Sequence, residues 1–150
     1  MGNKIPVSVL VVIYTKIGEV LLLNRADHPG YWQSVTGSCD YIDEPLEEAA
    51  CREVREETGL NCQEFELHNW HWQQVYEIYP HWRHRYADGV IHNTEHVFGL
   101  CLPTRQPIVL APREHIDYVW LPIDEAARQC FSDTNRAAVL KVKECLVNLL

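Results

Sequence analysis

The first forty residues alternate short apolar runs with turns. Residues 7–14 (VSVLVVIY) are almost all apolar and mostly β-branched, a pattern typical of a central strand covered on both faces. A turn at 16–18 leads into a second predicted strand at 20–23. Residues 32–36 form a short third candidate that stops at Gly37. The pattern therefore predicts a sheet whose central strand is the first one.

One segment, from Pro45 to Thr58, has a strong helical pattern. Pro45 suits the first helical position, and Asp43 or Glu44 is placed to cap the amino-terminal end. Gly59 is placed to close the carboxyl-terminal end. We therefore expect one well-bounded helix directly after the first strands.

The second half of the chain is predicted to be mainly strand. Aromatic or β-branched residues alternate with polar ones over 65–79 and again over 94–102. The remaining predicted segments are a loop at 80–93, a strand at 118–121, a helix at 124–130 and an amphipathic helix from about 135. Strands outnumber helices and do not alternate with them, so we expect an α+β protein with a mixed sheet rather than a Rossmann fold.

Length and composition are those of one globular domain, spanning residues 1–150, with 47% hydrophobic and 23% charged residues. The formal charge of −8 argues against binding to nucleic acid polymers or anionic membranes, and the longest apolar run is too short to span a bilayer. Six scattered cysteines without a Cys-x-x-Cys pair predict reduced thiols and a cytoplasmic location. No obligate protein partner is evident, and a phosphorylated small molecule remains compatible with this charge.

The helix has an unusual distribution of carboxylates. With Glu53 at zero on a helical wheel, Glu57 lies at about 40° and Glu56 at about −60°. The apolar residues within about 60° of Glu53 are Leu46, Ala49 and Ala50. The acidic side chains therefore continue the apolar stripe, whereas Glu48, Arg52 and Arg55 are predicted to face water, with a possible Glu48–Arg52 pair.

Three carboxylates turned toward the protein body repel one another and lose hydration, so a cation is expected among them. Oxygen ligands without His or thiolate suit Mg²⁺, with Mn²⁺ as a substitute, better than Zn²⁺. The alternative is that the Glu-rich helix is simply a solvated surface. Six histidines (His68, His71, His81, His84, His92 and His96) have no zinc-site spacing and are expected to be structural or in loops.

The residues around this helix resemble a known signature. Gly37, Glu44 and the runs 52–57 (REVREE) and 58–60 (TGL) are similar to the Nudix box, G-x5-E-x7-R-E-U-x-E-E-x-G-U. One departure is that six residues separate Gly37 from Glu44, so Asp43 stands at the strict spacing. The resemblance implies a Nudix fold, an α/β/α sandwich around a mixed sheet. It also implies a metal-dependent pyrophosphohydrolase that acts on a small-molecule triphosphate.

The same resemblance assigns roles within the motif. Glu53 and Glu57 match the principal metal ligands, and Glu56 matches a supporting ligand. Arg52 matches the arginine that orients the acidic cluster through a salt bridge. Glu114, outside the box, resembles the family's additional carboxylate, which completes the metal site or serves as base. Without the family, Glu114 would be taken for an ordinary exposed carboxylate.

Segments outside the box, including 32–38, 83–86 and 93–95, resemble the branch of the family that cleaves dihydroneopterin triphosphate in folate synthesis and was also described as acting on dATP. The substrate contacts that this implies are Lys4, Arg25, Thr36, Tyr76, Glu77, Ile78, Tyr79 and Ser132. The two cations suit phosphate, the tyrosines suit stacking on a ring, and Glu77 suits ring N–H donors. The alternative is that the two cations are ordinary surface residues and that the aromatic residues belong to a half-buried strand.

Two other functions stay open at this point. The chain would be a nucleotide-pool sanitiser if oxidised or non-standard triphosphates were its substrates. It would be a non-catalytic binding module if hydrolysis had been lost, although the retained helical carboxylates speak against that reading. A panel of triphosphates assayed with Mg²⁺ separates the three functions.

Overall fold

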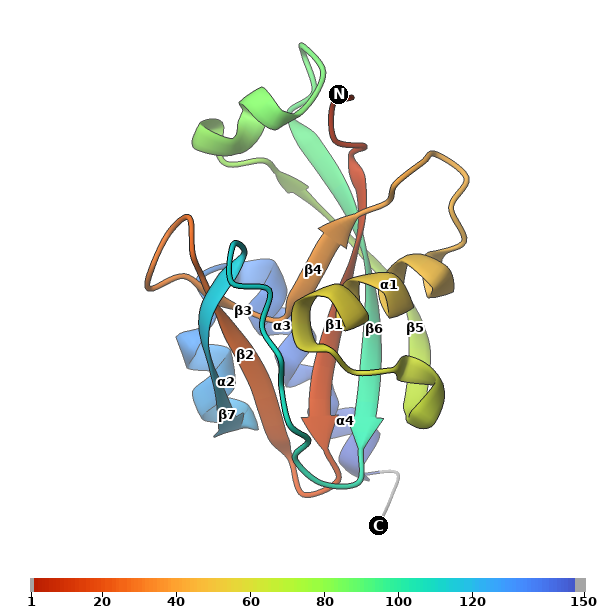
Figure 1. The fold of residues 1–150 in the computed structure, drawn as a ribbon, viewed down its shortest axis with the longest axis vertical. Coiled ribbons are helices and arrows are strands. Elements are labelled where there is room, and N and C mark those ends of the chain that lie inside the picture. The colour runs from red at the N-terminus through yellow and green to blue at the C-terminus, as the bar shows by residue number, and fades with distance from the viewer. Residues whose placement is uncertain (1, 148–150) are drawn as a thin grey trace.

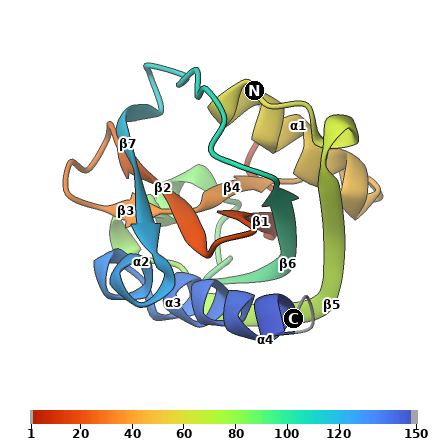
Figure 2. The same ribbon diagram turned by 90° about the horizontal axis from the view of Figure 1, so that it is seen from below.

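A computed structural model of the chain describes residues 2–147. It has a mixed sheet at the centre with helices on both faces (Figures 1 and 2). In chain order the elements are β1 (Val7–Thr15), β2 (Glu19–Arg25), β3 (Trp32–Gln33), β4 (Val35–Ser38), α1 (Leu46–Thr58), η1 (Cys62–Glu64), β5 (Glu66–Glu77), η2 (Pro80–Arg85), β6 (His92–Leu102), β7 (His115–Pro122), α2 (Ile123–Gln129), α3 (Asp133–Leu140) and α4 (Val142–Val147). The η elements are short 3₁₀ turns.

Strand β1 lies in the middle of the sheet, as its apolar sequence predicts. It runs parallel to β6, with pairs from Val7–Thr94 to Thr15–Leu102. On its other side, the first half of β1 pairs with β4 and its end pairs with β2, both antiparallel. Strand β5 extends the sheet beyond β6, and both β3 and β7 pair with β2. The mixed sheet is thus confirmed.

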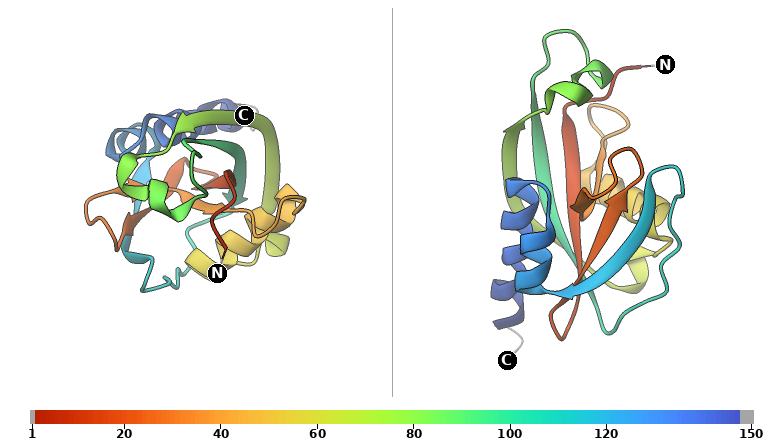
Figure 3. Two further views of the ribbon diagram at one scale, coloured as in Figure 1. Left: turned by 90° about the horizontal axis from the view of Figure 1, so that it is seen from above. Right: turned by 90° about the vertical axis from the view of Figure 1, so that its left-hand side faces the viewer.

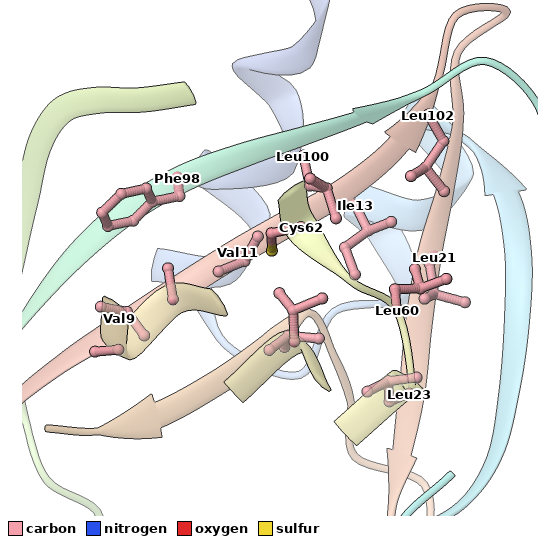
Figure 4. Close-up of a cluster of buried hydrophobic side chains, with 14 of the residues drawn as sticks. Val9, Val11, Ile13, Leu21, Leu23, Leu60, Cys62, Phe98, Leu100 and Leu102 are labelled. Carbon is pink, nitrogen blue, oxygen red and sulfur yellow. The ribbon is translucent and has the colours of Figure 1, made fainter. Parts of the chain in front are cut away.

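Both faces of β1 are buried, because alternate side chains enter two different cores. Val9, Val11 and Ile13 enter one core (Figure 4). There they pack with Ala49, Ala50 and Val54 of α1. Leu10, Val12 and Tyr14 pack with residues of α2, α3 and α4 on the opposite face. Figure 3 shows the sheet seen edge-on between these two helical layers. The predicted α/β/α sandwich is confirmed.

The boundaries of α1 differ slightly from the prediction. Pro45 is the N-cap residue rather than the first helical one, and no side chain caps the amino-terminal end. The predicted capping by Asp43 or Glu44 is therefore wrong, because the Glu44 carboxylate accepts hydrogen bonds from the backbone N–H of Asp40 and from Arg52 instead. Gly59 ends the helix in the left-handed conformation, with φ of 78°, as predicted.

Two other segments are divided where one element was expected. The strand predicted at 32–36 is interrupted at Ser34, whose backbone N–H donates to Asn135 Oδ1 at 2.8 Å while Asn135 Nδ2 donates to Ser34 Oγ at 3.0 Å. The last predicted helix begins at Asp133 and is broken at Lys141 into α3 and α4. The predicted loop 80–93 contains η2.

All six cysteines are free thiols, as expected.

No helix within residues 2–147 is both long enough and apolar enough to cross a bilayer.

Candidate active site

A cleft of about 890 Å³ opens at the end of the sheet where β1 and β6 begin and β4 and β5 end. Segments far apart in the chain border it. The amino-terminal segment lies beside η2 (Figure 3), and Lys4 pairs with Tyr86 in an isolated β-bridge. The cleft is lined by every site residue singled out from the sequence: Lys4, Arg25, Thr36, Arg52, Glu53, Glu56, Glu57, Tyr76, Glu77, Ile78, Tyr79, Glu114 and Ser132. The fold thus gathers the candidates into one place.

The first glycine of the motif makes room for the first helical carboxylate. Gly37 lies on β4 opposite Val9, so its Cα faces α1. A Cβ added at Gly37 would overlap the carboxyl group of Glu53. Only glycine therefore lets α1 approach β4 closely enough to bury Glu53, which is 8% exposed.

The Arg52 side chain turns toward the acidic cluster. Its Nη1 donates to Glu53 Oε1 at 2.7 Å, and its Nη2 donates to Glu44 Oε1 at 3.1 Å. It also lies 3.1 Å from Asp40 and 3.7 Å from Glu56. The prediction that Arg52 faces water and pairs with Glu48 is wrong, because the long side chain folds back along the helix surface to reach these carboxylates.

The extra residue between Gly37 and Glu44 is accommodated without losing Glu44. Glu44 is buried, and its hydrogen bond from Arg52 lowers the pKa of its carboxyl group. Asp43, which has the strict spacing of the motif, is exposed instead. Glu44 therefore orients Arg52, and Asp43 does not substitute for it.

A cluster of possible metal ligands lies at the carboxyl-terminal half of α1. One ligand atom from each of Glu57, Glu114 and His115 lies within 4.8 Å of the other two. Glu57 Oε1 and His115 Nδ1 are 3.7 Å apart, and both are buried without a hydrogen-bond partner. Buried polar atoms are rarely left without a hydrogen bond. A carboxylate oxygen and an imidazole nitrogen that face each other without one are suited to bind a cation together.

The protonation of this cluster follows from its burial. Burial, together with the hydrogen bond and charge of Glu53, raises the pKa of Glu57 well above its ordinary value. Burial also raises the pKa of Glu53, against the opposing effects of its hydrogen bond with Glu57 and of Arg52. For His115, burial and the nearby Arg25 guanidinium lower the pKa to about 4, so its imidazole is neutral at pH 7 and free to ligate a metal.

Comparison with known proteins agrees with this geometry. The NUDIX domain family matches residues 4–141. The chain belongs to the Nudix family.

Relatives of known activity cover nearly all of the chain. It is 44% identical over 139 residues to the dihydroneopterin triphosphate diphosphatase of Escherichia coli K12, covering 91% of each sequence. It is 39% identical over 137 residues to the enzyme of the same name from Haemophilus influenzae, covering 89% of this chain and 85% of the relative. The solved structure of the E. coli dihydroneopterin triphosphate pyrophosphohydrolase superposes with a TM-score of 0.86, at 41% identity and 99% coverage of both chains.

Helix α1 differs from the prediction in the burial of one carboxylate. Glu53 and Glu57 are buried, as the helical wheel predicts. Glu56 is not, since its side chain is 51% exposed. Glu56 sits at the edge of the apolar stripe, about 60° from its centre, so it borders the cleft from the solvent side.

His115 is a residue of this Nudix site that sequence reasoning missed. No motif spacing marks it, because it begins β7 and meets α1 only through the tertiary fold. Its position directly after Glu114 was the available signal. Its other ring nitrogen, Nε2, lies 3.3 Å from Gln33 Nε2, which fixes the ring in place.

The two candidate phosphate-binding cations are held in different ways. The Lys4 backbone N–H donates to the Arg85 carbonyl at 2.8 Å, which places the residue at the mouth of the cleft. Arg25 donates to both oxygens of Asp27 and to Gln33, and its guanidinium stacks 4.4 Å above the Trp82 ring. Three of its five N–H donors are thus engaged, and two remain available.

Tyr76 and Glu77 point to opposite faces of β5, as neighbouring strand residues must. The Tyr76 hydroxyl accepts a hydrogen bond from Asn93 Nδ2 at 3.0 Å inside the cleft. The Glu77 side chain is 65% exposed and accepts from Arg83 Nη2 at 2.7 Å. Both residues line the cleft, and their contacts with the substrate ring stay predictions.

The other candidates also line the cleft. Tyr79 stacks on Trp82 with centroids 5.6 Å apart, and Phe131 meets Tyr79 edge-on at 5.9 Å. Ser132 caps α3, since its Oγ accepts from the Asn135 backbone N–H. Thr36 and the buried Ile78 border the floor.

Proposed function

We propose that this Nudix hydrolase cleaves dihydroneopterin triphosphate into the monophosphate and pyrophosphate, with dATP or other nucleoside triphosphates as further substrates. The observation that carries the proposal is the arrangement of the cleft. One cleft brings together a carboxylate and histidine cluster, the cations Lys4 and Arg25, and the stacked rings of Tyr79 and Trp82. The names of the two bacterial relatives support the pterin as the preferred substrate.

The metal is proposed to be Mg²⁺, with Mn²⁺ as a substitute, held by Glu53, Glu57, Glu114 and His115, with Glu56 at the rim. A bound divalent ion screens phosphate charge and polarises an attacking water. Arg52 holds Glu53 in position through its 2.7 Å hydrogen bond. Glu114 is exposed at the cleft and serves either as a ligand or as the base that accepts a proton from the water.

The substrate is proposed to lie with its phosphates toward Lys4 and Arg25 and its ring toward Tyr79 and Phe131. The Lys4 ammonium is close enough to Glu53 and Glu114 for their charges to raise its pKa, whereas burial, Arg85 and Arg25 lower it more. Anionic oxygens near Lys4 would therefore be attracted by several cations at once. Flat rings suit the aromatic walls through stacking.

A substrate panel tests this proposal. The purified protein with Mg²⁺ is offered dihydroneopterin triphosphate, dATP, dGTP and 8-oxo-dGTP, and pyrophosphate release is measured with and without excess EDTA. We expect the pterin to have the highest kcat/KM and EDTA to abolish all turnover. Preference for 8-oxo-dGTP would instead identify a nucleotide-pool sanitiser, and no turnover with any compound would identify a binding module.

A further inference from the structure

The floor of the cleft contains a buried carboxylate that the proposed metal chemistry does not use. Glu95 lies on β6, opposite Ser8 of β1 and Gln74 of β5. It is 3% exposed and lines the cleft. Two residues further along the same face, Val97 packs in the core beneath α2 and α3, so Glu95 faces away from α1. It therefore lies on the opposite face of the sheet from Glu53 and Glu57.

The Glu95 carboxyl group is only partly satisfied. The nearby Thr36 side chain lowers the pKa of this carboxyl group, whereas Glu95 Oε1 is buried without a hydrogen-bond partner. Burial raises the pKa of Glu95 to about 7. A buried carboxylate oxygen without a donor is costly, so retaining it points to a donor that arrives with a ligand.

A second unpaired acceptor lies two residues away on the same face. Asn93 Nδ2 donates to Ser8 Oγ at 2.7 Å and to the Tyr76 hydroxyl at 3.0 Å, which fixes the orientation of the amide. Its Oδ1 is buried and has no partner. Asn93 is 1% exposed and also lines the cleft. The cleft therefore presents two buried acceptors without donors, and Tyr79 and Phe131 line the same cleft.

We propose that Glu95, assisted by Asn93, is the specificity-determining residue that reads the substrate ring by accepting hydrogen bonds from its ring N–H and exocyclic amine. This inference rests on the proposed function, since it concerns the same cleft. Pterin and guanine both carry an aminopyrimidinone edge with two adjacent donors, which one carboxylate accepts together. Adenine offers one donor beside one acceptor, so an ionised Glu95 binds it less well.

Glu77 is the rival reader, but its environment is less suitable. It is mostly exposed and already accepts from Arg83, so water competes for its oxygens. Hydrogen bonds to a buried group discriminate more strongly, because a mismatched ring leaves that group unpaired. The structure thus favours Glu95 over Glu77 for distinguishing rings.

The decisive experiment compares Glu95→Gln with Glu77→Gln. Glu66→Gln, at an exposed position of β5, is the matched control. Glutamine keeps the shape of glutamate but replaces one acceptor with a donor. We expect Glu95→Gln to lower kcat/KM for dihydroneopterin triphosphate and dGTP at least tenfold relative to dATP, mainly through KM. Glu66→Gln should leave every ratio unchanged. Equal losses on all three substrates, or a ratio change in Glu77→Gln, would overturn the proposal.

A binding measurement separates this inference from the proposed function. Neopterin, which has no phosphate, is titrated into metal-free protein while its fluorescence is followed. Wild type should bind it at least tenfold more tightly than Glu95→Gln does. If no triphosphate is hydrolysed but this difference persists, the proposed function fails and the inference stands. If hydrolysis occurs but the two proteins bind neopterin equally, or wild type does not bind it, the inference fails.

Wild type alone provides a further test should Glu95→Gln not fold, as judged by a thermal melt. The groups that face Glu95 from neighbouring elements, Ser8, Thr36, Gln74, Tyr76 and Tyr86, are uncharged at neutral pH, so Glu95 titrates among neutral partners. Protonated Glu95 donates one hydrogen bond and accepts another, which suits the donor and acceptor of adenine. Ionised Glu95 only accepts, which suits the two donors of the aminopyrimidinone edge. The dGTP to dATP ratio of kcat/KM should therefore rise between pH 6 and 8, and a flat ratio would contradict the proposal.

Discussion

The carboxyl group of Glu53 occupies the space that a side chain at Gly37 would need. Because Gly37 is in β4 and Glu53 in α1, this contact sets how closely the helix packs on the sheet. It also sets the position of one proposed metal ligand.

Gly37→Ala should therefore damage both activity and stability. The added methyl group forces α1 or the Glu53 carboxyl group to move, and overpacking of this kind typically costs about 1–3 kcal/mol of unfolding free energy. Misplacing a catalytic group lowers turnover by roughly 10²-fold. Urea denaturation and pyrophosphate release measure the two effects. Gly2→Ala is the control, since nothing lies within 4 Å of a Cβ there.

Arg52→Lys should lower kcat about 10- to 100-fold, because a single ammonium cannot hold Glu44 and Glu53 at once as the guanidinium does. The melting temperature should also fall, since the buried Glu44 loses hydrogen bonds. Arg55→Lys, at an exposed position of the same helix, is the matched control and should behave like wild type. An Arg52→Lys enzyme with unchanged kcat would show that Arg52 does not orient the cluster.

Glu57→Gln and Glu53→Gln should each lower kcat by roughly 10²-fold or more, because an amide is a poor ligand for Mg²⁺. Neither change should destabilise the metal-free protein, since glutamine keeps the shape of the side chain and removes a carboxyl group whose ionisation is disfavoured by burial. Addition of Mg²⁺ or Mn²⁺ should raise the melting temperature of wild type but not of Glu57→Gln. Glu48→Gln, at an exposed position of the same helix, is the control. A large loss of metal-free stability would mark these residues as structural.

The stability of wild type should fall with rising pH where Glu95 ionises. The pKa of Glu95 is about 7 in the folded protein and near 4.5 when unfolded, so the folded state holds the proton more tightly between these values. The contribution of protonated Glu95 to the free energy of unfolding is complete below pH 4.5 and is lost as the pH rises through 7. Glu95→Gln should therefore gain stability relative to wild type from pH 5 to pH 8.5, by up to about 3 kcal/mol. Urea denaturation at both values checks this, and a pH-independent difference would contradict it.

Features that depend on local periodicity could be predicted before the fold was known. The spacing of Glu53 and Glu57 fixes their common face, because the helical repeat is set by backbone hydrogen bonds. The apolar run of β1 likewise predicted a strand buried on both faces. The motif placed Gly37, Arg52 and the carboxylates in one region, and the structure gathers them at the cleft.

Contacts that depend on the pairing of distant segments became known from the fold alone. The register of β1 with β6 places Glu95 beside Ser8, and the packing of β7 near α1 brings His115 to Glu57. The folding back of Arg52 depends on where the loop before α1 presents Glu44. These contacts arise from sheet register and side-chain burial, which join residues separated by tens of positions. No local repeat in the chain encodes them, because register and burial are fixed only when the whole sheet assembles.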